Sequence, residues 1–189
     1  LHLVAAERER QVVLVLELET HGAKAGYIDD MVARMPPMWR HEGDTAVVTL
    51  SGACVAGSAG YMRLFGVVGY DDFLKATLDA ATHPETKRLL FHMETPGGDV
   101  TGLVEACENL VKISAMKPSA IYTGEQLCSA GYWLASAIKN NHITAGATAA
   151  VGSIGILKIH RESSKMLEND GIKVTVLRAG KFKAELNSM

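Results

Sequence analysis

Ser129 is the residue of this chain whose type and setting best suit covalent chemistry. It stands in QLCSAGYWLASA, residues 126 to 137, at a turn between the predicted strand 119–124 and an apolar helix. The first turn of a helix carries roughly half a positive charge, which favours an alkoxide or a tetrahedral oxyanion. Ala130 and Gly131 leave space for a substrate carbonyl. Serine is also among the best helix caps, so the local sequence leaves two interpretations open, a nucleophile and a cap.

A serine nucleophile needs a base, and lysine is the better candidate in this sequence. None of the seven histidines lies in a motif typical of a catalytic base, and His92, in an apolar strand, is interpreted as a hydrogen-bonded core histidine. Desolvation lowers the pKa of a lysine until its neutral amine accepts a proton. Lys181 and Lys183 follow the last predicted strand two residues apart, so their spacing does not choose between them. A solvated surface lysine is the default interpretation of either.

A second strand-to-helix turn, METPGGDVTG at residues 93 to 102, could bind the negative charge that acyl transfer develops. Pro96 restricts one φ angle, while Gly97 and Gly98 permit backbone conformations that other residues resist. Such a turn exposes backbone N–H groups at the amino end of a helix, where they can hold a developing oxyanion. A tight turn selected for packing alone is the competing interpretation.

A third stretch, AGATAAVGSIGILKIH at residues 145 to 160, is rich in small residues. This composition indicates close backbone packing beneath or beside the site. Ser153 could donate or accept a hydrogen bond, and a buried lysine amine would need such a partner. A tight loop between strands explains the same residues.

The elements that must position these residues alternate along the chain from Thr45 onward. Because strands alternate with helices, we expect an α/β fold with a mostly parallel sheet and right-handed crossovers. In such folds, sites form at the carboxyl ends of the strands. The predicted strands are residues 45–52, 87–94, 119–124, 142–146 and 172–180, and the predicted helices are 70–82, a segment around 104–111, 129–140 and 162–171.

Composition and charge exclude several classes of function. Nineteen basic and 21 acidic side chains give a net charge of -2, which offers no electrostatic footprint for nucleic acid or an anionic membrane. The longest apolar run, QVVLVLELE, is broken by charge far short of the roughly 20 residues that span a bilayer. Three irregularly spaced cysteines in apolar context indicate buried free thiols and a reducing, cytoplasmic compartment, and neither a metal nor a cofactor is expected.

In order and content, these motifs closely resemble the signal peptide peptidase A family of Ser/Lys proteases. ETPGGDV corresponds to the family's Ser-Pro-Gly-Gly turn, CSAGYWLASA to its nucleophile helix, AVGSIGI to a downstream motif, and RAGKFKA to its Gly-x-aromatic-Lys base motif. The match runs from about Thr45 to Ala184, and within the family it looks most like the tailed-phage head-maturation proteases of the protein C type. The resemblance implies a ClpP/crotonase-like fold with repeated strand–strand–helix units.

The resemblance also implies roles for individual residues. Ser129 matches the nucleophile, and Lys183, which follows the aromatic Phe182, matches the general base. By the same resemblance, the backbone amides of Gly98 and Ala130 form the oxyanion hole. The residues expected to support the Ser129–Lys183 pair are Ser153, Gly97 and Gly131.

Three departures from the family pattern are visible. Thr95 replaces the commoner serine before the Pro-Gly-Gly turn, a mild change if the backbone acts there. Cys128 stands beside the nucleophile, where a small residue is usual. The chain also ends six residues after Lys183, whereas the family continues well beyond it. We therefore expect residues 1–44 to be an arm or pro-segment and residues 45–189 to be a protease domain that lacks its C-terminal end.

The implied function is a serine endopeptidase that trims scaffold or capsid proteins during prohead maturation. The resemblance implies a homo-oligomeric ring in which the lysine of one subunit can serve the serine of its neighbour, and location in the host cytoplasm or prohead. One alternative is a bacterial peptidase that degrades signal peptides or membrane-associated peptides, and another is an inactive assembly component. A Clp-type Ser-His-Asp protease would want a histidine where Ser153 and Ile154 stand, and a crotonase-type acyl-CoA enzyme would not need the serine–lysine pair.

Overall fold

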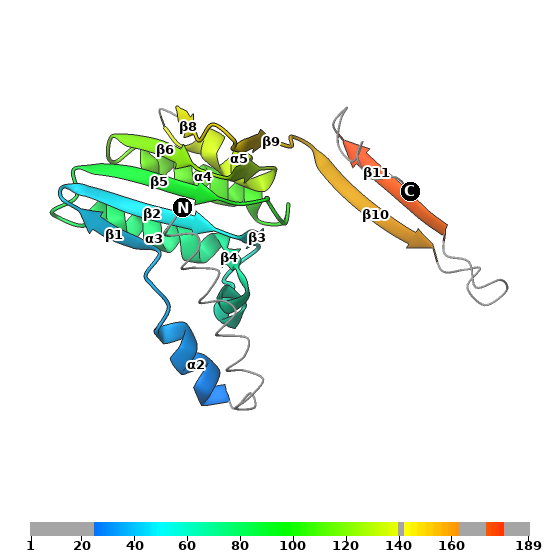
Figure 1. Ribbon diagram of the computed structural model, residues 1–189, viewed down its shortest axis with the longest axis horizontal. Helices are drawn as coiled ribbons and strands as arrows, with labels where there is room; N and C mark the ends of the chain where they lie inside the picture. The colour runs from blue at the N-terminus through cyan, green and yellow to red at the C-terminus, as the bar shows by residue number, and fades with distance from the viewer. Residues whose placement is uncertain (1–24, 140–141, 163–172, 180–189) are drawn as a thin grey trace.

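A computed structural model describes residues 25–139, 142–162 and 173–179 of this chain, which form a mixed α/β structure (Figure 1). The main sheet has five strands in the order β1-β2-β5-β6-β8. Their bounds are β1 Trp39–Glu42, β2 Thr45–Ser51, β5 Arg88–Glu94, β6 Ser119–Thr123 and β8 Ile143–Ala145. The β1–β2 pair is antiparallel and the other three pairs are parallel. The predicted fold class, α/β with a mostly parallel sheet, is confirmed.

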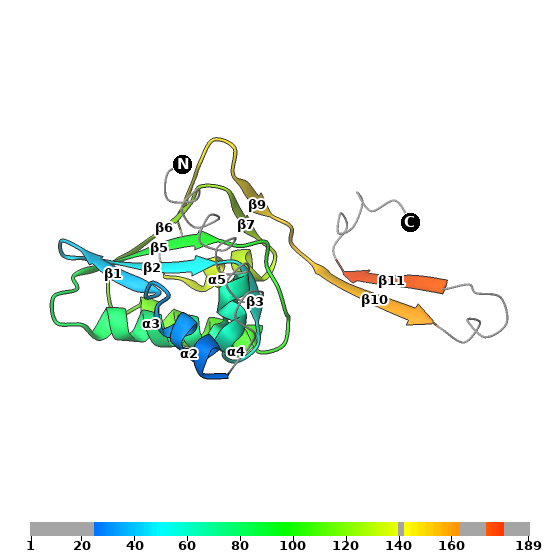
Figure 2. The ribbon, with the colours of Figure 1, turned by 60° about the horizontal axis from the view of Figure 1, so that its bottom comes forward.

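Three helices cover one face of this sheet (Figure 2). They are α3 Tyr70–Thr82, α4 Leu103–Ser114 and α5 Ala130–Ala137, and each falls where the sequence predicts a helix. Burial alternates along β5, so that Leu89, Phe91 and Met93 enter the core. Phe73 of α3 meets Phe91 edge-on, with ring centroids 6.2 Å apart. Burial of these apolar faces fixes the helices against the sheet.

A second layer of short strands continues from the main sheet. It contains β3 Ala53–Val55, β4 Val67–Gly69, β7 Gln126–Cys128 and β9 Ala150–Gly152, paired in parallel as β3–β4 and β7–β9. Isolated bridges Cys54↔Gly98 and Thr95↔Leu127 join these pairs through the Pro-Gly-Gly turn. The chain thus passes through this layer before α3, α4 and α5, and the layer brings both strand-to-helix turns together.

Residues before Thr45 contribute to the structure. Helix α2 spans Ala25–Ala33, and β1 is an edge strand of the main sheet. A 3-10 helix, η1 Gly60–Phe65, lies between β3 and β4. Residues 1–24 lie outside the described residues, so the prediction of an arm or pro-segment stays a prediction.

The last two strands correct one expectation. β10 Ile156–Glu162 and β11 Lys173–Ala179 form an antiparallel hairpin that stands apart from the α/β body (Figure 1). The predicted strand at residues 172–180 is therefore present, but it pairs with β10 instead of joining the parallel sheet. The sequence analysis predicts no strand at β10, because LKIH follows a run of small residues that fits close backbone packing or a tight loop equally well. The predicted helix at residues 162–171 lies almost wholly outside the described residues.

Candidate active site

Ser129 occupies the junction between β7 and α5 in an unusual backbone conformation. Its φ is 53° and its ψ is -120°, a region that residues other than glycine rarely adopt. Its side chain makes no capping hydrogen bond with the helix that it precedes. Ser129 therefore stands at the N-cap position of α5 without the side-chain hydrogen bond that a serine cap ordinarily supplies, and its role as nucleophile stays a prediction. Strained conformations of this kind persist only where the surrounding structure imposes them, and they concentrate at functional sites.

Two contacts hold the Ser129 backbone in place. Its N–H donates to the carbonyl oxygen of Gly152 at 2.8 Å, and its own carbonyl accepts the N–H of Trp133 at 3.0 Å. On the other side lies Gly97, where an added Cβ would be 2.5 Å from the Cβ of Ser129 and 3.0 Å from the nitrogen of Ala130. Gly97 also has a φ of +102°. Only glycine fits this position, and the close approach joins the two turns.

The Pro-Gly-Gly turn is held by one side chain and by the second layer of strands. The N–H of Gly97 donates to Oγ1 of the fully buried Thr95 at 3.0 Å. Cys54 donates its N–H to the carbonyl of Gly97 and accepts from the N–H of Asp99, both at 2.9 Å. Neither of these bonds uses the N–H of Gly98, which in an extended segment faces away from Cys54.

The first turn of α5 packs directly on this arrangement. At Gly131 an added Cβ would be 2.1 Å from Cγ2 of Thr95, so a larger residue would push the helix away. Ala130 is the first residue of α5, and its N–H belongs to the helix-end donors that lack an intrahelical partner. The structure thus brings Gly97, Ala130 and Gly131 together with Ser129.

Ser153 lies beside this cluster, directly after Gly152 at the end of β9. It is exposed and has a φ of 54°; apart from Ser129, it is the non-glycine residue with positive φ in the described chain. Lys181 and Lys183 lie outside the described residues, so the structure does not test the predicted base.

Glu94, at the end of β5, was not singled out by the sequence analysis. Its carboxylate accepts hydrogen bonds from the backbone N–H groups of Gly124, Glu125 and Gln126, the last two at 2.9 and 3.0 Å. Burial by itself raises the pKa of Glu94, but these N–H donors lower it below its ordinary value. Nε2 of His92 lies 3.3 Å from Oε1 of Glu94, and the His92 side chain is 31% exposed, which corrects the expectation that this histidine lies in the core. The one signal in the sequence that could have drawn attention to Glu94 is an acidic residue at the end of an apolar strand.

The cysteines are free thiols, as predicted. Burial raises the pKa of Cys54, with a smaller opposing effect of its hydrogen bond to Thr95, and burial raises the pKa of Cys107 to about 11. Both are therefore protonated near neutral pH. Cys128, next to Ser129, is only partly buried, which corrects the expectation that all three are buried.

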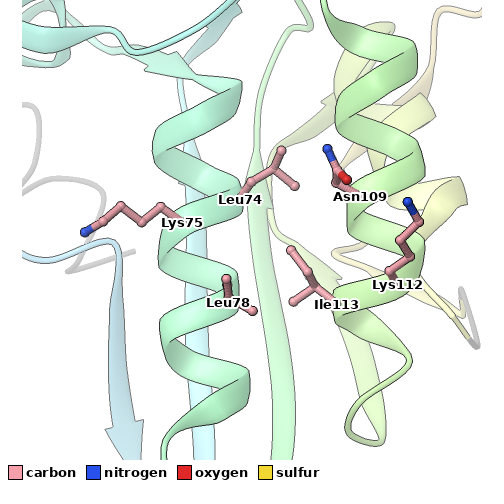
Figure 3. A pocket seen from close by; sticks show the side chains of 6 residues that line it. All are labelled: Leu74, Lys75, Leu78, Asn109, Lys112 and Ile113. Carbon is pink, nitrogen blue, oxygen red and sulfur yellow. The ribbon is translucent and has the colours of Figure 1, made fainter.

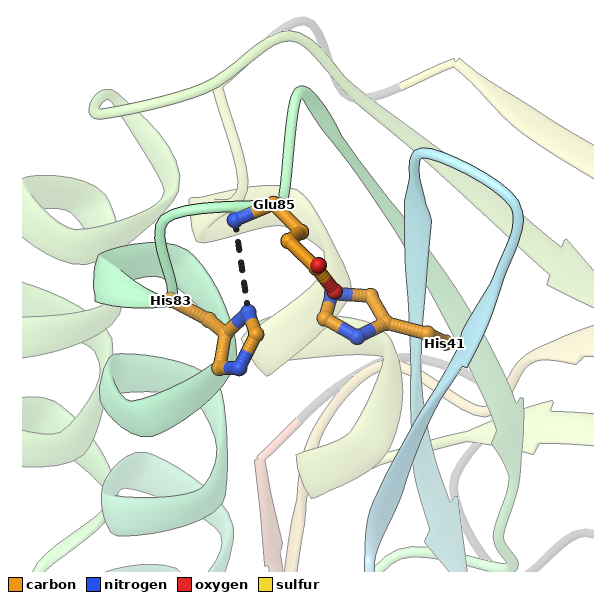
Figure 4. A group of neighbouring side chains, drawn as sticks. All are labelled: His41, His83 and Glu85. Atoms are coloured by element: carbon orange, nitrogen blue, oxygen red, sulfur yellow. Dashed lines mark hydrogen bonds between the residues drawn. The ribbon is translucent and has the colours of Figure 1, made fainter.

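One group of side chains has the donor atoms for a metal ion (Figure 4). His41, His83 and Glu85 offer ligand atoms that lie within 4.8 Å of one another. One nitrogen of each ring already has a partner, because Nε2 of His41 lies 2.8 Å from Oγ1 of Thr86 and Nδ1 of His83 accepts the N–H of Glu85 at 3.4 Å. These residues lie at the amino ends of β2 and β5, opposite to the end that carries Ser129.

A groove of about 390 Å³ separates α3 from α4 (Figure 3). Its floor is apolar, each helix contributes one lysine, and none of the lining residues was predicted to be a site residue. The lining residues are Leu74, Lys75, Leu78, Asn109, Lys112 and Ile113.

Within the described residues, no helix has the length and apolar character needed to cross a bilayer.

Comparisons with known proteins bear on this site. The model of peptidase family S49 matches residues 112–189, a range that contains Ser129, Ser153 and Lys183. The predicted family relationship is confirmed. The S49 match covers the nucleophile helix and the base motif that the sequence analysis singled out, but not the Pro-Gly-Gly turn.

Three curated relatives extend the similarity upstream. The chain is 30% identical over 159 residues to capsid assembly protease C of Escherichia phage lambda, which covers 84% of this chain and 36% of that protein. It is 25% identical over 150 residues to the head-tail preconnector protein GP5 of Enterobacteria phage P21, covering 79% and 30%. It is 29% identical over 131 residues to Protease 4 of Salmonella typhi, covering 69% and 20%. The chain thus spans about a third or less of these relatives.

Proposed function

We propose that this protein is a serine endopeptidase that trims scaffold or capsid proteins during phage head maturation. The observation that carries the proposal is the strained backbone of Ser129 at the start of α5, packed against Gly97 of the Pro-Gly-Gly turn. Similarity to capsid assembly protease C of phage lambda supports the substrate class.

In the proposed reaction, the neutral amine of Lys183 takes the proton of the Ser129 hydroxyl while Oγ attacks the peptide carbonyl carbon. The N–H groups of Gly98 and Ala130 bind the resulting oxyanion. The lysine ammonium then gives its proton to the leaving amine, and the C–N bond breaks to leave an acyl-enzyme. Water, deprotonated by the same lysine, attacks the ester, releases the acid product and restores the Ser129 hydroxyl.

The register of the β10–β11 hairpin supports a route for the base within one chain. Ala179 lies opposite Ile156, three residues after Ser153. Lys183 follows Ala179 by four residues, and four extended residues span at most about 14 Å. In the homo-oligomeric ring that the proposal includes, a neighbouring subunit is the other source of this lysine. Mixing Ser129→Ala with Lys183→Ala protein distinguishes the two, because activity returns only if the lysine acts between subunits.

The test of the proposed function is hydrolysis of a scaffold or capsid substrate by the wild type and by single variants. Ser129→Ala and Lys183→Ala should each reduce the rate by at least about 10³-fold, since the remaining groups give only residual catalysis. Lys181→Ala is the matched control and should leave the rate within about threefold. A fluorophosphonate should label the wild type at Ser129. Cleavage by Ser129→Ala at the wild-type rate would contradict the proposal.

A second proposed substrate class, signal peptides or membrane-associated peptides, follows from the resemblance to the signal peptide peptidase A family, and the similarity to Protease 4 of Salmonella typhi supports a peptidase of either class. The same dyad would act on these substrates. Parallel assays of a signal peptide and a scaffold protein separate the two classes, because the better substrate has the larger kcat/KM. An inactive assembly component of the same fold would fail both assays and would resist fluorophosphonate labelling.

A further inference from the structure

The carboxylate of Glu94 binds a whole turn of the chain. Glu94 ends β5, and its side chain is 13% exposed. Beyond the N–H groups of Gly124, Glu125 and Gln126, it accepts the hydroxyl of Thr123 at 3.3 Å. Consecutive N–H groups that converge on one anion form a nest, in which the charge of the carboxylate offsets the aligned N–H dipoles.

This turn connects β6 to β7, and β7 leads straight to Ser129. The main chain next to Glu94 holds β7 as well: the N–H of Thr95 donates to the carbonyl of Gln126 at 2.8 Å, and the N–H of Cys128 donates to the carbonyl of Thr95 at 2.9 Å. The Glu94 side chain therefore holds the start of β7, and the Thr95 main chain pairs with β7 along the strand. The position of Ser129 follows from the position of this strand, because Ser129 comes directly after its last residue.

The groups around Glu94 favour its ionised form. His92 on β5 faces Oε1 at 3.3 Å, and the ring of Tyr122 on β6 packs on His92 with centroids 5.6 Å apart. Glu125, in the bound turn, is exposed. A glutamine at position 94 would keep the shape, but its NH₂ group would meet N–H donors where an acceptor is required.

We propose that Glu94 is a positioning residue for Ser129, because its carboxylate binds the 123–126 turn and thereby aims β7 and the nucleophile at the substrate carbonyl. The inference rests on the proposed peptidase function. Displacement of a reacting group by about 1 Å costs on the order of 100-fold in rate. Loss of the charge therefore lowers kcat and leaves KM close to its original value.

The decisive experiment compares Glu94→Gln with Glu108→Gln, which removes a charge from the exposed face of α4. For Glu94→Gln we expect kcat and the rate constant of fluorophosphonate labelling to fall about 10- to 100-fold, with KM within about threefold. Glu108→Gln should match the wild type. A Glu94→Gln protein that is labelled at the wild-type rate overturns the positioning role while leaving the peptidase proposal intact. Wild-type protein that is not labelled at Ser129 overturns the peptidase proposal and this inference with it.

A measurement on the wild type covers the case in which Glu94→Gln does not fold. The lowered pKa of Glu94 means that its contribution to stability is complete above the unfolded-state value of about 4.3 and is lost as the pH falls through the lower folded-state pKa. The amide proton resonances of Gly124, Glu125 and Gln126 should therefore titrate together below about pH 4.3. Amides that titrate with different midpoints, or that do not respond, contradict the bound turn.

Discussion

The two ends of the main sheet both gather polar residues, and they differ in what the backbone does there. At the amino ends, ligand atoms of His41, His83 and Glu85 come within 4.8 Å through ordinary side-chain packing, and a hydrogen bond between His41 and Thr86 helps to orient one ring. At the carboxyl ends, Ser129 stands in a strained conformation between two turns, with its N–H bound to a neighbouring strand.

The first group is a cluster formed by ordinary side-chain packing, whereas the arrangement around Ser129 depends on packing between segments that are distant in the sequence. Titratable residues gather wherever packing and hydrogen bonds suit them. A strained serine that contacts a glycine needs a fold that holds both turns, and the free energy of that strain comes from the surrounding packing. The contrast predicts that substitutions at the carboxyl end affect stability and reactivity together, whereas those at the amino end affect stability alone.

The largest effect is expected from Gly97→Ala. The new Cβ would be 2.5 Å from Ser129 at a φ of +102°, so overpacking and strain together should lower the free energy of unfolding by about 3 kcal/mol. Gly43→Ala is the control, because Gly43 has a φ of +64° with nothing within 4 Å and should lose only about 1 kcal/mol. Urea denaturation measures both. Equal losses would mean that contact with Ser129 contributes nothing.

Thr95→Val comes next. It keeps the shape of a fully buried side chain but leaves the N–H of Gly97 without its acceptor, which costs about 2 kcal/mol. Thr95→Ser keeps the acceptor and removes one methyl group, for a cost of about 1 kcal/mol. We expect Thr95→Val to have the lower melting temperature and the slower fluorophosphonate labelling of Ser129, compared with Thr95→Ser. The reverse ranking would assign Thr95 a packing role only.

A smaller effect, of opposite sign, is expected from Ser129→Gly. Glycine relieves the strain at a φ of 53°, so this variant should be more stable than Ser129→Ala by about 1 kcal/mol while both lack hydrolytic activity. The difference in their urea midpoints measures the strain directly. A less stable glycine variant would show that the serine conformation is not strained.

The smallest effect belongs to the amino end. His83→Ala removes a ring that packs on His41 and Trp39 with centroids 4.5 and 5.6 Å apart, and should lower the free energy of unfolding by at most about 1 kcal/mol. Labelling of Ser129 should stay within about twofold of the wild type. A large loss of labelling would show that the two ends are coupled through the sheet.

Much of the fold could be predicted from the sequence, because the main strands and helices carry long apolar patterns. Among the three-residue strands, β8 was predicted but β3, β4, β7 and β9 were not, since three residues carry too little periodicity to identify a strand dependably. Glu94 was missed for a related reason. Its partners are backbone N–H groups of residues 124–126, and backbone donors leave no trace in residue type.

By itself, the sequence determined which residues could react and the order in which they come. Ser129 after a strand, the paired glycines Gly97 and Gly98, and the lysines near the end are visible as types and spacings. Only the tertiary structure showed the backbone conformation of Ser129, because a φ of 53° and the contact with Gly97 arise where two segments 32 residues apart (129 minus 97) are packed together. Strain of this kind is a property of packing between distant segments, which local sequence does not encode.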